Sequence, residues 1–106
     1  MRDFIKDIVK KEFDYVKDFI EIENLDDLDR GDFVYIVEVN NYNNNRYYTY
    51  CNNWNCFLFS CFENLQNRNI KEIDKVLNYT KLSCQEIIEL YEEHENCKLY
   101  FFKAIR

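Results

Sequence analysis

Glycine, alanine, proline and histidine are nearly missing from this chain. Its 106 residues include one glycine, one alanine, no proline and one histidine. A single glycine cannot form the glycine-rich loop that cradles the phosphates of a nucleotide. A single histidine leaves few ways to build a catalytic Cys–His pair, which needs a nucleophile beside an oriented base. We therefore predict that the protein is not an enzyme and needs no cofactor.

Long apolar runs are missing as well. No stretch approaches the ~20 apolar residues of a membrane-spanning helix. The N-terminal stretch MRDFIKDIVKKEF has no apolar block like that of a signal peptide. The five cysteines are an odd number, which favours free thiols in a reducing compartment over a disulfide framework. We expect a cytoplasmic protein without membrane contact.

Asparagine, tyrosine and phenylalanine are abundant instead, with 14, 9 and 9 copies. These residues have AT-rich codons, whereas glycine, alanine and proline have GC-rich ones. The coding bias of an AT-rich genome therefore accounts for the composition. We expect the source to be an AT-rich bacterium, or a phage, virus or plasmid within one, in which case the cytoplasm is that of the host cell.

The pattern of apolar residues predicts a single α+β domain over residues 1–106. The length is typical of one domain, and a hydrophobic fraction of 47 % is sufficient for a core. Apolar residues at spacings of three and four predict helices, and β-branched or aromatic runs predict strands. The expected elements are a helix at 3–22, strands at Phe33–Val39, Arg46–Cys51 and Cys56–Phe62, helices at 69–80 and 82–96, and a strand at 97–105. The order α-β-β-β-α-α-β predicts an antiparallel-rich sheet with helices packed on one face.

The strand register follows from the short asparagine-rich turns, which place Val39 opposite Arg46 and Cys51 opposite Cys56. We expect the bulkier face to pack against the helices, and it comprises Tyr35, Val37, Tyr48, Tyr50, Phe57 and Phe59. The outer face would be exposed, and its apolar residues are Val34, Ile36, Tyr47, Thr49 and Leu58. A shift of one residue would exchange the two faces.

The cysteines and the histidine offer one candidate zinc set, formed by Cys51, Cys56, His94 and Cys97. Zinc motifs usually contain close C-x-x-C pairs, and neither cysteine pair here has that spacing. Free cysteine more often packs as a small buried apolar residue. We therefore predict no metal site.

Acidic residues are concentrated between positions 12 and 32. This segment holds nine acidic and two basic residues and therefore carries −7, whereas the whole chain carries −6, so the other 85 residues sum to +1. Phosphate contacts need lysine and arginine, so we expect no direct binding of nucleic acid. One interpretation of such a run is a solvated surface. The other is an electrostatic docking face for a basic protein.

We predict a small acidic protein-binding module that inhibits a nuclease or a defence enzyme by covering its basic nucleic-acid-binding surface. Phage anti-defence proteins, such as anti-CRISPR proteins, and toxin-immunity proteins are comparable in size and acidity. The carboxylates expected to contact the partner are Glu21, Glu23, Asp26, Asp27, Asp29 and Asp32. Tyr42 and Trp54, both predicted at turns, would be exposed apolar anchors. Alternatives are a homodimer or larger homo-oligomer formed through the outer sheet face, and a small-molecule or metal-binding module on the cysteine and tyrosine side.

Overall fold

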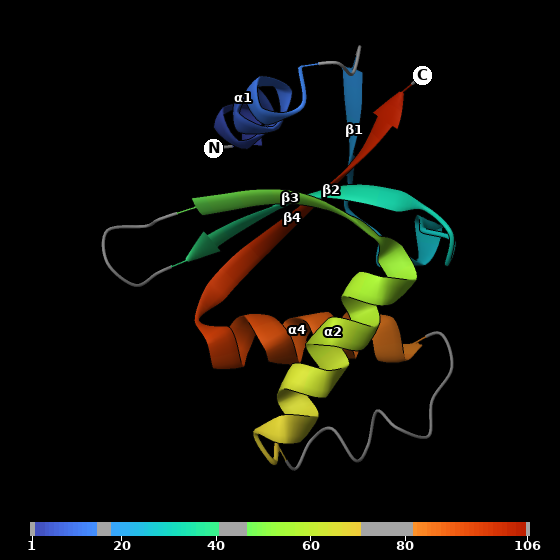
Figure 1. Ribbon diagram of the computed structural model, residues 1–106, viewed down its shortest axis with the longest axis vertical. Coiled ribbons are helices and arrows are strands. Elements are labelled where there is room, and N and C mark those ends of the chain that lie inside the picture. The colour runs from blue at the N-terminus through green and yellow to red at the C-terminus, as the bar shows by residue number, and fades with distance from the viewer. Residues whose placement is uncertain (1, 15–17, 41–46, 71–81, 106) are drawn as a thin grey trace.

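The computed structural model describes residues 2–14, 18–40, 47–70 and 82–105 (Figure 1). In chain order the elements are helix α1 (Arg2–Glu12), strand β1 (Asp18–Ile22), the 3-10 turn η1 (Leu25–Asp27), strands β2 (Phe33–Asn40) and β3 (Tyr47–Asn53), helices α2 (Trp54–Asn67) and α4 (Leu82–Glu95), and strand β4 (Cys97–Ile105). The strands form one antiparallel sheet in the order β1-β4-β2-β3. The predicted α+β class and the order α-β-β-β-α-α-β are confirmed. No helix in these four stretches is long and apolar enough to cross a membrane.

The sheet lies between two helical layers, with α1 on one side and α2 and α4 on the other (Figure 1). The smaller core, under α1, comprises Ile5, Ile8, Val9, Phe19, Tyr35, Val37 and Phe102. The larger core, under α2 and α4, includes Val34, Ile36, Trp54, Phe57, Leu65, Ile88, Leu99 and Phe101. The prediction that helices pack on one face is therefore wrong. Strand β2 explains the difference, because all four residues from Val34 to Val37 are buried and both of its faces need cover.

Residues 18–22 form β1 and not the last turns of the predicted helix 3–22. Helix α1 ends at Glu12, and the chain returns as a strand that runs antiparallel to β4. Phe19 is buried and Ile20 is exposed, which is the alternation of a strand with one covered face. Apolar spacings of three and four continue through this stretch, so tertiary pairing decides its conformation.

Residues 54–67 form α2, so the predicted strand Cys56–Phe62 is wrong. The side-chain oxygen of Asn53 accepts the backbone N–H groups of Asn55 and Cys56 at 3.0 and 3.3 Å and so caps the helix. The buried residues of the helix, at spacings of three and four, are Trp54, Phe57, Cys61 and Leu65. Aromatic residues favour strands by propensity, but burial of one helical face prevails here.

The pairing of β2 with β3 differs by one residue from the prediction, because Val39 lies opposite Tyr47 and not Arg46. Tyr50 consequently shares a face with Ile36, which lies directly opposite it. The face predicted to be exposed is covered by α2 and α4, and Ile36 has no exposed surface. It is therefore not available as a dimer surface.

The C-terminal elements match their predicted positions within one residue. Helix α4 ends at Glu95 and β4 begins at Cys97. Asn96 lies between them with a φ of 52°, and Asn69 has a φ of 57° after the end of α2. Asparagine tolerates this left-handed region better than most residues, so it terminates helices in a chain that has almost no glycine. The predicted helix 69–80 lies, from residue 71 onward, outside the described residues.

Candidate functional site

The acidic segment between β1 and β2 is held by buried leucines. Leu25 and Leu28 are packed in the larger core, next to residues of α4. The side chain of Asn24 accepts the N–H of Asp26 at 3.0 Å and caps η1. The exposed acidic residues of this segment are Glu23, Asp26, Asp27 and Asp29. The two buried leucines and the Asn24 cap thus fix the backbone, while these carboxylates remain at the surface.

Part of this charge has no ion-pair partner among the described residues. Across the four described stretches, no ion pair joins a cation to Asp26, Asp27 or Asp29. Arg30 is the only lysine or arginine between residues 18 and 32, and it is exposed. No cation of the described residues therefore competes with another molecule for these three carboxylates.

Asp32 has a structural role instead. Its carboxylate accepts the N–H of Asp29 at 2.9 Å and lies 3.1 Å from the ammonium of Lys103. The hydrogen bond from Asp29, and then Lys103, hold the pKa of Asp32 below its ordinary value of 3.8, against desolvation, which raises it. Its backbone oxygen accepts the N–H of Trp54 at 2.7 Å. Asp32 therefore links the acidic segment to β4 and to the start of α2.

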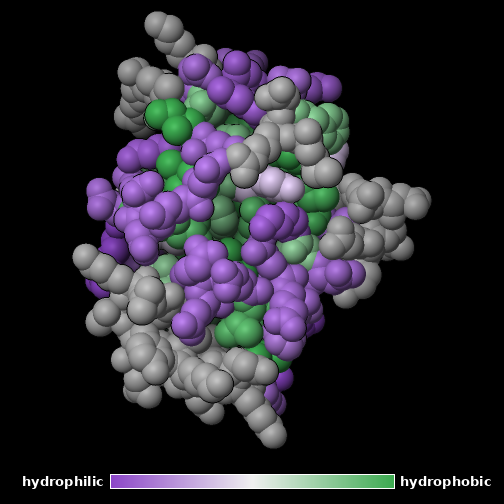
Figure 2. All heavy atoms as spheres, turned by 180° about the vertical axis from the view of Figure 1, so that it is seen from behind, coloured by the Kyte–Doolittle hydropathy of each residue, from purple (hydrophilic) through white to green (hydrophobic). Residues whose placement is uncertain are grey.

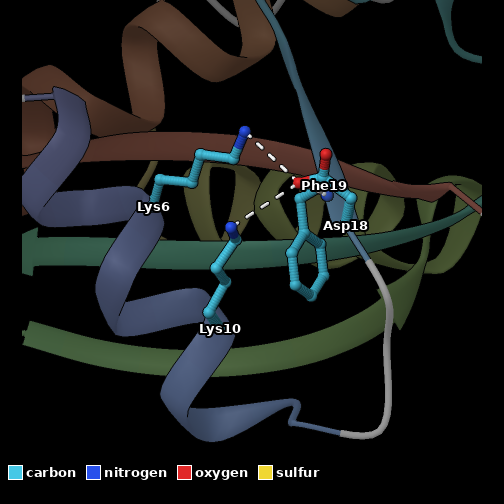
Figure 3. Close-up of polar contacts among 4 residues, drawn as sticks. All are labelled: Lys6, Lys10, Asp18 and Phe19. Atoms are coloured by element: carbon cyan, nitrogen blue, oxygen red, sulfur yellow. Dashed lines mark hydrogen bonds and ion pairs between the residues drawn. The ribbon is translucent and has the colours of Figure 1, made fainter.

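Asp18, in the same acidic stretch of sequence, faces cations of α1 (Figure 3). Its Oδ1 atom lies 3.4 Å from Nζ of Lys6 and 3.8 Å from Nζ of Lys10. The N–H of Phe19 donates to the same oxygen at 2.8 Å. This hydrogen bond and then Lys6 lower the pKa of Asp18 below 3.8. The charge of Asp18 is thus partly compensated by the two lysines of α1.

One of the two predicted apolar anchors, Trp54, is buried. Trp54 is the first residue of α2 and is only 3 % exposed. Its ring stacks on that of Phe57 and meets that of Phe101 edge-on, with centroids 6.3 and 5.5 Å apart. Trp54 is therefore a core residue, and the prediction that it sits exposed at a hairpin tip is wrong. Tyr42 lies outside the described residues.

Helix α4 adds acidic side chains that the sequence prediction missed. Between Leu82 and Glu95 it carries five glutamates and no lysine or arginine. Three of them, Glu86, Glu89 and Glu93, are exposed and recur at spacings of three and four, which places them on one stripe. The charge count of this helix was a usable signal, but only the fold brings the helix against η1.

A pocket of about 150 Å³ opens between the acidic segment, α4 and the first half of β4. Glu21 and Glu23 line it together with Gln85 and Glu92 of α4. Two of the predicted site residues are thus brought beside two that were not predicted. Figure 2 shows the molecule from behind, where hydrophobic residues are visible at the surface between hydrophilic ones.

A separate group of titratable side chains lies between β2, α2 and α4. The Tyr91 hydroxyl donates to Oε1 of Glu38 at 3.2 Å. Burial, followed by the charge of Glu38, raises the pKa of the Cys97 thiol to about 12. Burial also raises the pKa of Cys61. In both thiols burial disfavours the thiolate, which is the form that attacks electrophiles and binds metals.

The candidate zinc ligands are not assembled into a site. Cys51 and Cys56 are exposed, whereas Cys97 is buried. Within the described part of the chain, no group of three or more histidine, cysteine, aspartate or glutamate side chains could hold a metal ion.

No protein-family model, no curated protein and no solved structure matches this chain at a significant level. The charge, packing and shape described above are therefore the grounds for a functional proposal.

Proposed function

We propose that this protein is a small acidic binding module that covers a basic, nucleic-acid-binding surface of another protein. The observation that supports the proposal best is the packing of two acidic elements against each other. Leu25 and Leu28 of the acidic segment share a core cluster with Ile87 and Ile88 of α4. Segment 21–32 and α4 thus form one surface, which we call the acidic face.

The acidic face has a large excess of negative charge. Segment 21–32 contains six acidic residues and one arginine, and α4 contains five acidic residues and neither lysine nor arginine, so the two sum to −10 with His94 neutral. Lys103, Lys98 and Arg68 form ion pairs with Asp32, Glu92 and Glu95, and counting these three cations leaves −7. Like charges held this close repel one another, and a basic partner relieves that repulsion. Such a field also raises the rate of association with a positively charged surface.

Carboxylates on a packed frame can take the place of phosphates. A nucleic-acid-binding protein presents lysine and arginine to phosphate oxygens, and these side chains pair equally with carboxylates. Because Leu25 and Leu28 fix the backbone of the acidic segment, little backbone freedom is left to lose on binding. Inhibition of a nuclease or a defence enzyme would follow from steric exclusion of its nucleic acid.

The test is capture of partners on the immobilised protein from lysate of an AT-rich bacterium. The test variant is Asp26→Asn/Asp27→Asn/Asp29→Asn, which spares Asp32 because of its structural role. The matched control, Asp7→Asn/Glu12→Gln/Asp14→Asn, makes the same change of charge at exposed positions in and just after α1. Duplex DNA and high salt serve as competitors.

We expect wild type and the control to retain a basic protein that duplex DNA and salt both release, and we expect the test variant to lose it. Equal capture by the test variant, or a partner that DNA does not displace, would refute the proposal. The acidic face would then be a solvated surface.

A second candidate function is self-association through β3. This strand lies at one edge of the described sheet and carries no charged residue. Tyr47 and Tyr48 are 47 % and 51 % exposed there, and Phe4 of α1 lies beside Tyr47 with ring centroids 6.5 Å apart. An uncharged edge strand is a template for pairing with another strand. In a chain of net charge −6, an uncharged surface is also where two copies repel least.

A further inference from the structure

The pocket beside the acidic face forms where β1 separates from β4. The two strands pair up to Ile22 and Phe101. Beyond this point β1 gives way to η1, so the preceding residues of β4 lose that neighbour while α4 approaches from below (Figure 1). Leu99 is one of these residues, and its N–H donates to Oε2 of Glu92 at 2.8 Å. The Glu92 carboxylate of α4 thus accepts a hydrogen bond from a backbone N–H of β4 at the pocket.

The lining combines an apolar set with a charged set. The apolar residues are Ile22, Leu25, Ile88, Leu99 and Phe101. The charged residues are Glu21, Glu23, Glu92 and Lys98, which sum to −2. A site with this lining suits a ligand that has an apolar stem and a cationic head.

One of these carboxylates is already held in place. Glu92 accepts the N–H of Leu99, lies 3.5 Å from Nζ of Lys98, and has a side chain that is only 15 % exposed. A carboxylate can accept about four hydrogen bonds, so Glu92 can still accept one from a ligand. Because it is fixed before binding, little of its freedom remains to be lost.

We propose that this pocket receives the side chain of an arginine or lysine from the basic partner, an inference that rests on the proposed function. A cavity of about 150 Å³ holds roughly six heavy atoms, which is the size of an arginine side chain beyond its β-carbon. The apolar residues cover the stem, and the glutamates at the rim bind the head. A buried arginine of this kind is a typical source of affinity at protein interfaces.

Two other ligand classes fit the lining less well. An anion would meet three carboxylates and one lysine, so repulsion would exceed attraction. A purely apolar ligand would bury carboxylates without giving them a hydrogen-bond donor, which is costly. The cationic side chain satisfies both halves of the lining.

The test is an NMR titration of isotope-labelled full-length protein with N-acetylarginine amide. We expect the methyl signals of Ile22, Leu25, Ile88 and Leu99 to shift and saturate at roughly millimolar ligand. N-acetylnorleucine amide has the apolar stem without the charge, and N-acetylglutamate amide has the opposite charge. Neither should move these signals.

Three variants sharpen the result. Glu21→Gln/Glu23→Gln should weaken arginine binding at least about five-fold, whereas Asp26→Asn/Asp27→Asn, with the same change of charge outside the pocket, should change it less than about two-fold. Gln85→Trp keeps every charge, fills the mouth of the pocket, and should abolish the methyl shifts. Gln85 is exposed, so its replacement should leave the fold intact. This variant therefore still tests the pocket if the double glutamate variant fails to fold.

Static methyl signals in wild type, or equal losses in the two charge variants, would overturn the inference. The same experiments separate it from the proposed function. If a DNA-sensitive basic partner is captured while arginine leaves the pocket methyls unmoved, the pocket inference fails and the function stands. If arginine binds but no such partner is captured, the function fails and the pocket remains a site for cationic side chains.

Discussion

The carboxylate of Asp32 lies 3.1 Å from the ammonium of Lys103, so the last acidic residue of the segment is tied to strand β4. The same carboxylate accepts the N–H of Asp29 at 2.9 Å. These two contacts close the loop between η1 and β2 and leave Asp26, Asp27 and Asp29 at the surface. One carboxylate thus orders the segment, whereas the other three are exposed at its surface.

We predict that Asp32→Ala lowers the free energy of unfolding by about 1–2 kcal/mol, because it removes a hydrogen bond and an ion pair together. Lys103→Met removes only the ion pair, which is partly exposed, and should cost less than about 1 kcal/mol. Urea denaturation of both single variants and the double variant completes a thermodynamic cycle. A Lys103→Met variant as unstable as Asp32→Ala would show that the ion pair, and not the hydrogen bond, holds the loop.

Stability should also fall in acid through Asp18 and Asp32. Both have a pKa below the ordinary value of 3.8, Asp18 mainly through the N–H of Phe19 and Asp32 mainly through that of Asp29. The unfolded chain therefore binds protons before the folded one does, and stability decreases as pH falls. The contribution is complete above pH 3.8 and is lost as pH falls through the folded-state pKa values.

Urea denaturation at a series of pH values down to about 2 measures this slope. The double variant Asp18→Asn/Asp32→Asn should show a shallower decrease than wild type. Asp7→Asn, at an exposed position on α1, is the matched control and should leave the slope as it is. An unchanged slope in the double variant would contradict the assignment.

Trp54 should contribute to stability and not to partner binding. It is 3 % exposed and lies among aromatic rings of α2 and β4. We expect Trp54→Ala to cost about 3–5 kcal/mol, enough to unfold much of a small domain, and Trp54→Phe to cost less. Circular dichroism during thermal unfolding measures both. Partner capture by Trp54→Phe should equal that of wild type, and a selective loss of capture would restore the anchor interpretation.

The parts of the fold that could be predicted correctly are those with an unambiguous local pattern in the sequence. Helix α4 and strand β4 are separated by Asn96, and β2 is a β-branched run, so their positions were recognisable. The order of elements was also right, but one strand lies in a segment predicted as helix, and one helix lies in a segment predicted as strand. The strand that completes the order is β1, hidden in the predicted helix, whereas the predicted strand Cys56–Phe62 belongs to α2. Pairing with β4 makes residues 18–22 a strand, and the Asn53 cap favours the helix that follows it.

The candidate site could be predicted only in part for a similar reason. The charge run made the acidic carboxylates visible, and Asp26, Asp27 and Asp29 are indeed exposed. Nothing local distinguishes Asp32, whose partner Lys103 is 71 residues away in the sequence. The pocket depends on Glu92 and Gln85, which reach the acidic segment only through long-range packing. Composition therefore indicates a charged surface, but its shape is a property of the fold.

The cap of α2 is a local feature that can be tested alone. Asn53→Ala should lower the free energy of unfolding by about 1 kcal/mol, because two N–H groups of the first turn lose their acceptor. Asn55→Ala, two residues later and exposed, removes an asparagine side chain without removing the cap and should have little effect. Urea denaturation followed by the fluorescence of Trp54 compares the two. Equal costs would mean that the hydrogen bonds of Asn53 do not stabilise the helix.

Self-association through β3 gives a last prediction. Tyr48 is exposed and lies directly opposite Glu38 on β2, so Tyr48→Lys places a cation where a cross-strand ion pair can keep the sheet intact. In a dimer that joins β3 to its copy, the same substitution places charge in the new strand pair and should disrupt it. Light scattering coupled to gel filtration measures the mass.

The control for this variant is Ile20→Lys, which introduces the same charge at an exposed position on the opposite edge strand, β1. If β3 is the interface, wild type and Ile20→Lys should run as dimers at high micromolar concentration and Tyr48→Lys as a monomer. A monomeric wild type would eliminate this second function, while a dimer broken by Ile20→Lys would move the interface to β1. Edge β1 already carries Asp18 and Glu21, and edge charges of this kind oppose strand pairing between copies. The difference in charge between the two edges is therefore the physical reason to expect pairing at β3.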